Sequence, residues 1–136
     1  MCGIVGYSPT GFRAAHVLLH GLQTLEYRGY DSSGAAFFTA RGVEIIKSKG
    51  TVSQLQKRLE QCSIRSSCGI AHTRWATHGA PDERNAHPHR QGSVTLVHNG
   101  IIENHALLAK ELEAKGYRFH TQTDSEVACA CIDEAY

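Results

Sequence analysis

The sequence predicts an α+β domain in which amphipathic helices pack against antiparallel strands. Three observations support this fold class: apolar residues recur with helical spacing over residues 12–25, two strand-like segments are joined by a short turn within residues 35–48, and a capping pattern at residues 123–126 opens a later helix. With 136 residues, 41% of them hydrophobic, the chain can bury enough surface for one core. We therefore expect one globular unit.

The N-terminal segments are expected to form a strand, a turn and a helix. Residues 3–7 are a short apolar run, and residues 9–11 (Pro-Thr-Gly) are a turn signal. In residues 12–25 the apolar positions lie three and four residues apart, so this helix presents one broad apolar face to a sheet. Those positions are Ala15, Leu18, Leu19, Leu22 and Leu25.

A strand pair and a second helix are expected next. Residues 27–34 have the composition of a loop, and residues 35–39 and 43–48 are expected to pair as strands. Ser53 and Gln56 form a capping box that opens a helix ending at residue 61. The buried stripe of that helix is expected to be Val52, Leu55, Leu59 and Cys62.

Two further strands are expected at residues 69–73 and 93–98. They are separated by a long polar segment, residues 74–92, which contains two prolines and three histidines. A structureless connection of that length is usually either a functional loop or a disordered one. We therefore expect site residues at its ends.

Two helices are expected at the C-terminal end of the chain. Asn104 is a suitable N-cap for the first, which should stop at Gly116. Thr123 and Glu126 form a capping box for the second, which is still running at Tyr136. We therefore expect residues 1–136 to form a domain that is incomplete at its C-terminus.

The composition excludes several classes of function. A formal charge of +1 provides no electrostatic surface for a nucleic acid, and no apolar stretch is long enough to span a membrane. The five cysteines are an odd number without the spacing of a disulfide framework, which indicates a reducing, cytoplasmic environment. A small neutral or zwitterionic substrate fits this chain better.

No metal and no cofactor are expected. Nine histidines, His87 and His89 among them, raise the alternative of a metal site, but no cysteine or glutamate stands beside these two at a recognised zinc spacing. The chain also has no phosphate-binding loop and no dinucleotide fingerprint.

Cys2 is a candidate nucleophile because it directly follows Met1. Removal of the methionine leaves a thiol and a free α-amine on one residue. The amine, with an ordinary pKa of about 8, can take the thiol proton directly or through one water. Such a residue can hydrolyse an amide through a thioester. The alternative is a small packing residue that happens to follow the start of the chain.

Arg74 and Asp124 are candidates for binding a zwitterion. Arg74 is expected where a strand enters the long polar segment, and a guanidinium can hold a carboxylate by two parallel hydrogen bonds. Asp124 is expected in the first turn of a helix, where it can receive a substrate ammonium. The alternatives are an ion pair of Arg74 with Asp82 or Glu83, and an ordinary acidic residue at a helix start.

The Asn99-Gly100 pair allows two interpretations. One is a β-hairpin turn between the strand before it and the apolar residues 101 and 102. The other is an oxyanion hole, in which the Asn99 side-chain amide and the Gly100 N–H donate to a tetrahedral intermediate. Geometry has to decide between them.

Six blocks of the chain together resemble the glutaminase domain of the glutamine fructose-6-phosphate amidotransferases, also called glucosamine-6-phosphate synthases. The blocks are residues 2–6, 26–32, 72–79, 85–89, 98–105 and 123–126. The resemblance covers the whole chain and implies the N-terminal-nucleophile hydrolase fold, a four-layer αββα sandwich. In the full-length enzymes it also implies an isomerase domain that binds fructose 6-phosphate, and it allows a homodimer.

The same resemblance implies a role for each matching residue. Cys2 attacks the side-chain amide of L-glutamine, and Asn99 and Gly100 form the oxyanion hole. Arg74 and Asp124 hold the carboxylate and the ammonium of the substrate. The other matches are Trp75, Thr77 and His78 in the glutamine-binding segment, His87 beside the pocket, and Arg28 near the nucleophile.

Two alternatives stay open at this point. Amidophosphoribosyltransferases share the N-terminal cysteine and the Asn-Gly pair, although residues 26–30 and 74–77 are more similar to the sugar enzymes. The second alternative is a catalytically silent fragment that binds glutamine through Arg74 and Asp124. Because the chain contains no isomerase part, we expect it to be at most a glutaminase by itself.

Overall fold

A computed structural model describes residues 2–8, 11–76 and 79–136. Its helices are α1 (Ala14–Leu25), α2 (Val52–Glu60), α3 (His105–Ala114) and α4 (Asp124–Ala135), with a 3₁₀ turn, η1, at Glu26–Arg28. Its strands are β1 (Gly3–Tyr7), β2 (Ser32–Thr39), β3 (Gly42–Lys49), β4 (Cys68–Arg74), β5 (His89–Gln91) and β6 (Val94–Leu96). Much of the turn predicted at residues 9–11 lies outside the described residues.

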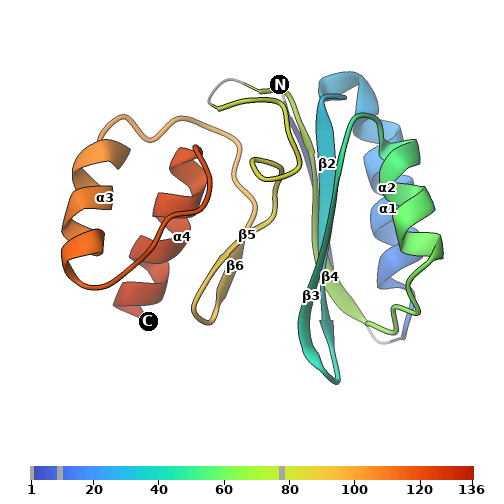
Figure 1. The fold of residues 1–136 in the computed structure, drawn as a ribbon. Helices are drawn as coiled ribbons and strands as arrows, with labels where there is room; N and C mark the ends of the chain where they lie inside the picture. Colours follow the sequence, from blue (N-terminus) through green and yellow to red (C-terminus); the bar gives the residue numbers. More distant parts are fainter. Residues whose placement is uncertain (1, 9–10, 77–78) are drawn as a thin grey trace.

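These elements form four layers (Figure 1). Helices α1 and α2 cover one face of a four-stranded sheet, and the β5–β6 hairpin lies on the other side of that sheet. Helices α3 and α4 form the outer layer beyond the hairpin (Figure 1). The order helix, sheet, sheet, helix confirms the predicted αββα architecture.

The four-stranded sheet has the order β1-β4-β2-β3, and every neighbouring pair is antiparallel. Strand β4 is central, so Thr73 lies opposite Gly3 of β1 on one side and opposite Ser33 of β2 on the other. The Gly3 N–H also donates to the Thr73 hydroxyl at 3.1 Å. This register places Cys2 beside the end of β4, where Arg74 lies.

The main core lies between the four-stranded sheet and the helices α1 and α2. Its fully packed members are Ala14, Leu18, Leu22, Ala35, Phe37, Val52, Leu55, Leu59 and Ala71. The apolar faces predicted for both helices are thereby confirmed. Cys62 is exposed, because α2 ends at Glu60, so the predicted stripe is wrong at that residue.

The structure also corrects the ends of several predicted elements, among them the strand expected at residues 93–98, which spans Val94–Leu96. Helix α1 begins at Ala14 rather than at residue 12, and β2 begins at Ser32, inside the segment predicted as a loop. The capping box at Ser53 does not form. Helix α2 begins at Val52, whose N–H donates to the Glu26 carboxylate at 2.6 Å. A side chain from η1 therefore caps this helix, and no local pattern reveals such a contact.

The segment predicted as a long loop contains strand β5, which pairs with β6 across a turn at Gly92 and Ser93. Both strands have three residues, which is too short for a period of two to stand out. No strand follows β6 before α3 within residues 97–104. The hairpin interpretation of Asn99-Gly100 is therefore wrong.

The two C-terminal helices begin where the sequence predicts. The Thr123 hydroxyl accepts the Glu126 N–H at 3.4 Å, which confirms the N-cap of α4. The Glu126 carboxylate does not return to the cap but accepts the N–H groups of His120 and Thr121. Asn104 precedes α3 without a side-chain capping bond. Within the three described ranges, no helix is long and apolar enough to cross a membrane.

Candidate active site

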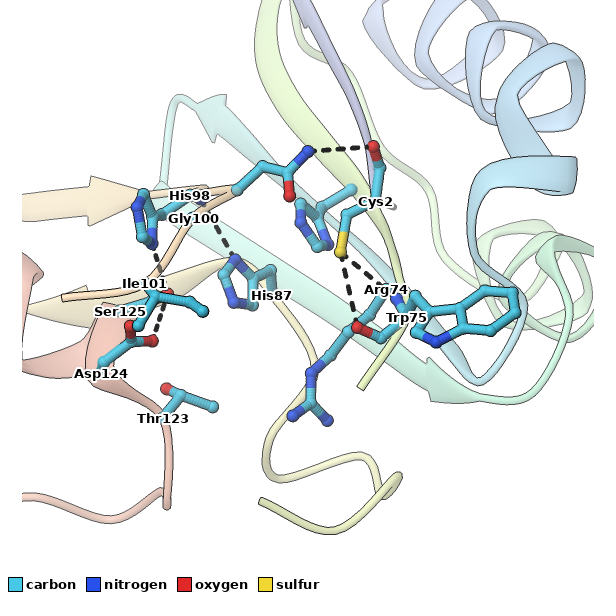
Figure 2. A pocket seen from close by; sticks show the side chains of 12 residues that line it. Cys2, Arg74, Trp75, His87, His98, Gly100, Ile101, Thr123, Asp124 and Ser125 are labelled. Carbon is cyan, nitrogen blue, oxygen red and sulfur yellow. Dashed lines mark hydrogen bonds between the residues drawn. The ribbon is translucent and has the colours of Figure 1, made fainter. Parts of the chain in front are cut away.

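A pocket of about 270 Å³ lies where the two halves of the chain meet (Figure 2). Its walls come from the residue before β1, the end of β4, the segment before β5, the segment after β6 and the start of α4. The lining residues are Cys2, His72, Arg74, Trp75, His87, His98, Asn99, Gly100, Ile101, Thr123, Asp124 and Ser125. Seven predicted site residues therefore share one cavity. Thr77 and His78 lie outside the described residues.

Cys2 lies at the end of the pocket next to β4, and its sulfur faces the main chain of Trp75. The Trp75 N–H donates to Sγ at 3.3 Å, and Sγ lies 3.7 Å from the Trp75 carbonyl oxygen. The Cys2 carbonyl accepts from Arg28 Nε at 3.3 Å and from Asn99 Nδ2 at 3.2 Å. Donors from three separate segments therefore fix this residue, and an N–H that points at Sγ stabilises a thiolate.

Arg28 thus contacts the main chain of Cys2, which agrees with its expected place near the nucleophile. Trp75 contributes its main chain to the sulfur, while its indole is 47% exposed and meets the Tyr30 ring edge to face at 5.4 Å. The resemblance to the family implied that Trp75 belongs to the site. It gave no sign that the main chain, rather than the indole, touches the nucleophile.

Arg74 is the last residue of β4 and is almost fully buried. Its Nη1 donates to the Ala80 carbonyl at 3.0 Å. Of the two carboxylates proposed as alternative partners, Glu83 pairs with Arg58 at 2.6 Å, and Asp82 accepts the N–H of Asn85 at 2.8 Å. Both carboxylates have other partners, and Arg74 lines the pocket (Figure 2).

Asp124 occupies the first position of α4 and lines the same pocket as Arg74. Its Oδ2 accepts the Ile102 N–H at 2.7 Å, and its Oδ1 lies 3.4 Å from the Ser125 hydroxyl. A carboxylate has acceptor capacity for further donors, and the helix N-terminus stabilises its charge. A cation and an anion therefore line one small cavity, an arrangement that suits a zwitterion.

Asn99 and Gly100 lie in the extended segment between β6 and α3 and reach toward Cys2. Asn99 Nδ2 is held by the Cys2 carbonyl, and an amide nitrogen has a second hydrogen to donate. A Cβ on Gly100 would lie 2.8 Å from Nε2 of His98, so the imidazole occupies the space that a side chain would need. This contact explains why a glycine stands here.

Sequence reasoning missed five pocket residues: His72, His98, Ile101, Thr123 and Ser125. His72 had a usable signal, because residues two apart on a strand share a face and His72 is two before Arg74. Thr123 and Ser125 flank Asp124 at the start of α4, where the sequence predicts only a capping role for Thr123. His98 and Ile101 were hidden by the hairpin interpretation.

Three buried histidines form a stack, and two of them, His72 and His87, line the pocket. The rings of His72 and His87 are 4.1 Å apart and nearly parallel, and His89 meets His87 edge to face at 4.4 Å. Burial lowers the pKa of His72 to about 4 and that of His89 to about 3. Burial also lowers the pKa of His87, and the neighbouring histidines and Arg74 act in the same direction. All three rings are therefore neutral near pH 7.

No group of three or more histidine, cysteine, aspartate or glutamate side chains in the described part of the chain is placed to hold a metal ion. Two members of the stack use a ring nitrogen in a hydrogen bond to a neighbouring segment: His87 Nδ1 accepts the His98 N–H at 3.2 Å, and His89 Nε2 lies 3.0 Å from the Thr123 hydroxyl. The two ring nitrogens of His72 are buried without a hydrogen-bond partner among the residues that the structure describes.

Comparisons with known proteins agree with this geometry. A family model described as "Glutamine amidotransferase domain" matches residues 72–136. Among solved structures, the glutamine phosphoribosylpyrophosphate amidotransferase from B. subtilis superimposes with a TM-score of 0.74 at 26% identity, covering 97% of this chain and 28% of that one. A structure described as the allosteric regulatory enzyme of purine biosynthesis gives 0.76 at 27% identity, covering 97% and 29%. The chain belongs to the glutamine amidotransferases with the N-terminal-nucleophile hydrolase fold.

Sequence similarity narrows the family further. The chain is 50% identical to the glutamine–fructose-6-phosphate aminotransferase (isomerizing) of Thermus thermophilus, with 100% of this chain and 23% of that protein covered. It is 49% identical to the enzyme of the same name from Fusobacterium nucleatum, with the same coverage. The phosphoribosyl enzyme is similar mainly in structure, at about half this identity. The resemblance to the sugar enzymes is therefore confirmed, and the chain spans 23% of the length of these relatives.

Proposed function

We propose that this chain hydrolyses L-glutamine to glutamate and ammonia, as the glutaminase part of a glutamine–fructose-6-phosphate aminotransferase. The observation that carries the proposal is one pocket that is lined by Cys2 together with Arg74 and Asp124, whose side chains suit a carboxylate and an ammonium. Glutamine carries both of these groups at one end and the amide to be cleaved at the other. Arg74 and Asp124 therefore bind one end of glutamine and leave its side-chain amide as the end next to the Cys2 sulfur.

The reaction needs Met1 to be removed, because an amine inside a peptide bond is not basic. The free α-amine of Cys2 then takes the thiol proton, Sγ bonds to the amide carbon, and the oxygen becomes an oxyanion. The second hydrogen of Asn99 Nδ2 and the Gly100 N–H stabilise that charge, and one such donor contributes about 10²- to 10³-fold in rate where tested. The amine returns the proton to the leaving nitrogen, and ammonia departs.

A glutamyl thioester is left on Cys2. Water attacks the same carbon, the α-amine takes a proton from the water, and the C–S bond breaks as glutamate forms. Sγ leaves as a thiolate, which the Trp75 N–H is placed to stabilise, and then regains the proton. In the complete protein we propose that the ammonia reaches an isomerase domain and converts fructose 6-phosphate to glucosamine 6-phosphate in the cytoplasm. The resemblance to the family also allows the complete enzyme to be a homodimer.

Replacing Cys2 tests the proposal, because the chain has a matched control in the exposed Cys62. In purified protein whose mass shows that Met1 is absent, Cys2→Ala should lower glutamate release at least about a thousand-fold while glutamine binding stays measurable. Cys62→Ala should keep full activity. A diazoketone analogue of glutamine should label the wild type once, on Cys2.

Comparable turnover in Cys2→Ala would remove the nucleophile assignment. Glutamine binding without glutamate release in the processed wild type would instead support the catalytically silent alternative. A mass that retains Met1 predicts inactivity from a blocked amine, and removal of the methionine should then restore turnover.

A further inference from the structure

His87 makes more specific contacts than a residue that merely lines the pocket. Its ring Nδ1 accepts the main-chain N–H of His98 at 3.2 Å, and the side chain is only 5% exposed. Its carbonyl lies against β2, where a Cβ on Gly34 would come within 2.1 Å of the carbonyl oxygen. The main chain of His87 therefore packs against the large sheet, and its ring accepts a hydrogen bond from the segment between β6 and α3.

The chemical state of the ring follows from these contacts. Because Nδ1 accepts a hydrogen bond, it carries no proton, and the neutral ring bears its hydrogen on Nε2. The parallel His72 ring and the edge of His89 fix the plane of the imidazole. Its pKa is lowered chiefly by burial, with further contributions from His72, His89, Arg74 and Lys47. The acceptor therefore persists at neutral pH.

A hydrogen bond to the His98 amide restricts the two residues that follow it directly, Asn99 and Gly100. His98 has a second attachment, through ring Nδ1 to the Ser125 hydroxyl at 3.0 Å, and its imidazole fills the space beside Gly100. Asn99 in turn reaches the Cys2 carbonyl. With the His98 main chain held at one point and its side chain at another, the next two residues have little freedom to rotate.

We propose that His87 is a positioning residue for glutamine hydrolysis: by accepting the His98 N–H at Nδ1, it orients the Asn99 amide and the Gly100 N–H toward the carbon that Cys2 attacks. This inference rests on the proposed glutaminase function. It gives His87, which the resemblance places beside the pocket, an action on the proposed oxyanion hole through the His98 main chain.

Two replacements of His87 separate positioning from packing. Asparagine places its Oδ1 close to where Nδ1 lies, so His87→Asn keeps an acceptor but leaves a small void. Phenylalanine fills the volume and keeps the stack, but His87→Phe turns a C–H toward the His98 N–H and leaves that donor unpaired. If His87 positions the His98 main chain, the asparagine variant should have the higher kcat. If His87 only fills space, the phenylalanine variant should have the higher kcat.

In the complete protein with Met1 removed, we expect His87→Phe to lower kcat for glutamate release by about 10- to 100-fold, with KM changed less than about threefold, since small misplacements of catalytic groups cost up to about 10²-fold. His87→Asn should stay within about threefold of the wild-type kcat. His87→Gln, whose amide reaches the place of Nε2 instead, should resemble the phenylalanine variant.

Hydrogen exchange of the His98 amide gives a readout that does not depend on activity. We expect it to be protected in the wild type and in His87→Asn, and to exchange at least about tenfold faster in His87→Phe while amides of the main core stay unchanged. Equal kcat in the asparagine and phenylalanine variants, or an unchanged His98 exchange rate in His87→Phe, would overturn the proposal. If the wild type releases no glutamate, the proposed function fails, whereas the exchange rates still show whether His87 holds this segment.

Discussion

The two halves of the molecule are held together by different interactions. Residues 3–74 surround an apolar core between the large sheet and helices α1 and α2, with Phe37 fully buried at its centre. In residues 80–136 the apolar cluster is small and consists of Leu112, Val127 and Ala130. The buried side chains of that half are largely polar: Asn85, His87, His89, Thr123, Asp124, Ser125 and Glu126.

This difference matches what each half contributes to the site. Apolar packing is non-directional and sets the distance between layers, and the first half supplies the rigid strands that carry Cys2 and Arg74. Hydrogen bonds are directional, and the second half supplies Asn99 and Asp124, whose side chains must point at particular atoms. Hydrogen bonds that are only partly buried or exposed therefore hold Asn99, His98 and Asp124.

The largest expected effect is on the first half. Phe37→Ala removes a fully buried ring from the apolar core and should lower the free energy of unfolding by about 3–5 kcal/mol. Phe38, the next residue on β2, is 66% exposed on the opposite face, so Phe38→Ala should cost less than about 1 kcal/mol. Urea unfolding of the two variants measures the difference, and equal losses would mean that the core lies elsewhere.

A smaller loss is expected from the second half. Asn85 Oδ1 accepts the Gln122 N–H at 2.9 Å, and its Nδ2 donates to the Ala80 carbonyl at 3.1 Å. Asn85→Ala leaves buried polar groups unpaired and should cost about 2 kcal/mol. The exposed Asn104, which makes no capping bond, is the control, and Asn104→Ala should cost less than about 0.5 kcal/mol.

Hydrogen exchange can locate the effect of Asn85→Ala. Amides of α4 and of residues 118–123 should lose protection, while those of α1 and β4 should keep theirs. Uniform loss of protection across both halves would show that the two networks unfold as one unit, and the proposed contrast between the halves would then concern chemistry but not stability.

Per pH unit, the smallest expected effect is the contribution of one buried histidine to the loss of stability in acid. His72 and His89 have folded pKa values of about 4 and about 3, below the ordinary value of 6.5. Unfolding therefore takes up protons below pH 6.5, so stability is full above that pH and falls as pH drops from 6.5 toward 4, by about 1.4 kcal/mol per pH unit for each such histidine.

Unfolding free energies measured at several pH values between 6.5 and 5 check this sign. His72→Asn should reduce the dependence by about 1.4 kcal/mol per pH unit, whereas His16→Asn, at an exposed position of α1, should leave it unchanged. Stability that rises as the pH falls would contradict the assignment of neutral buried rings.

The sequence was most informative where local patterns decide the structure. The three- and four-residue spacing in α1 and the Thr123 cap of α4 depend on neighbours a few residues apart, and both were confirmed. Of the residues that line the pocket, the sequence positions alone made Cys2, Arg74 and Asp124 candidates, whereas Trp75 and His87 were found by their resemblance to a family. Asn99-Gly100 shows the limit, because the dipeptide fits a hairpin turn until the absence of a strand within residues 97–104 excludes that interpretation.

By itself, the sequence determined the four helices, the antiparallel strands of the large sheet and the residue types needed to cleave an amide. Tertiary structure alone decided that Glu26 caps α2, that the Trp75 main chain faces the Cys2 sulfur, and that His87 holds the main chain of His98. The physical reason is the range of the interactions. Helix periodicity and caps act within one or two turns of the chain, whereas these hydrogen bonds join segments that come together only after both layers have packed.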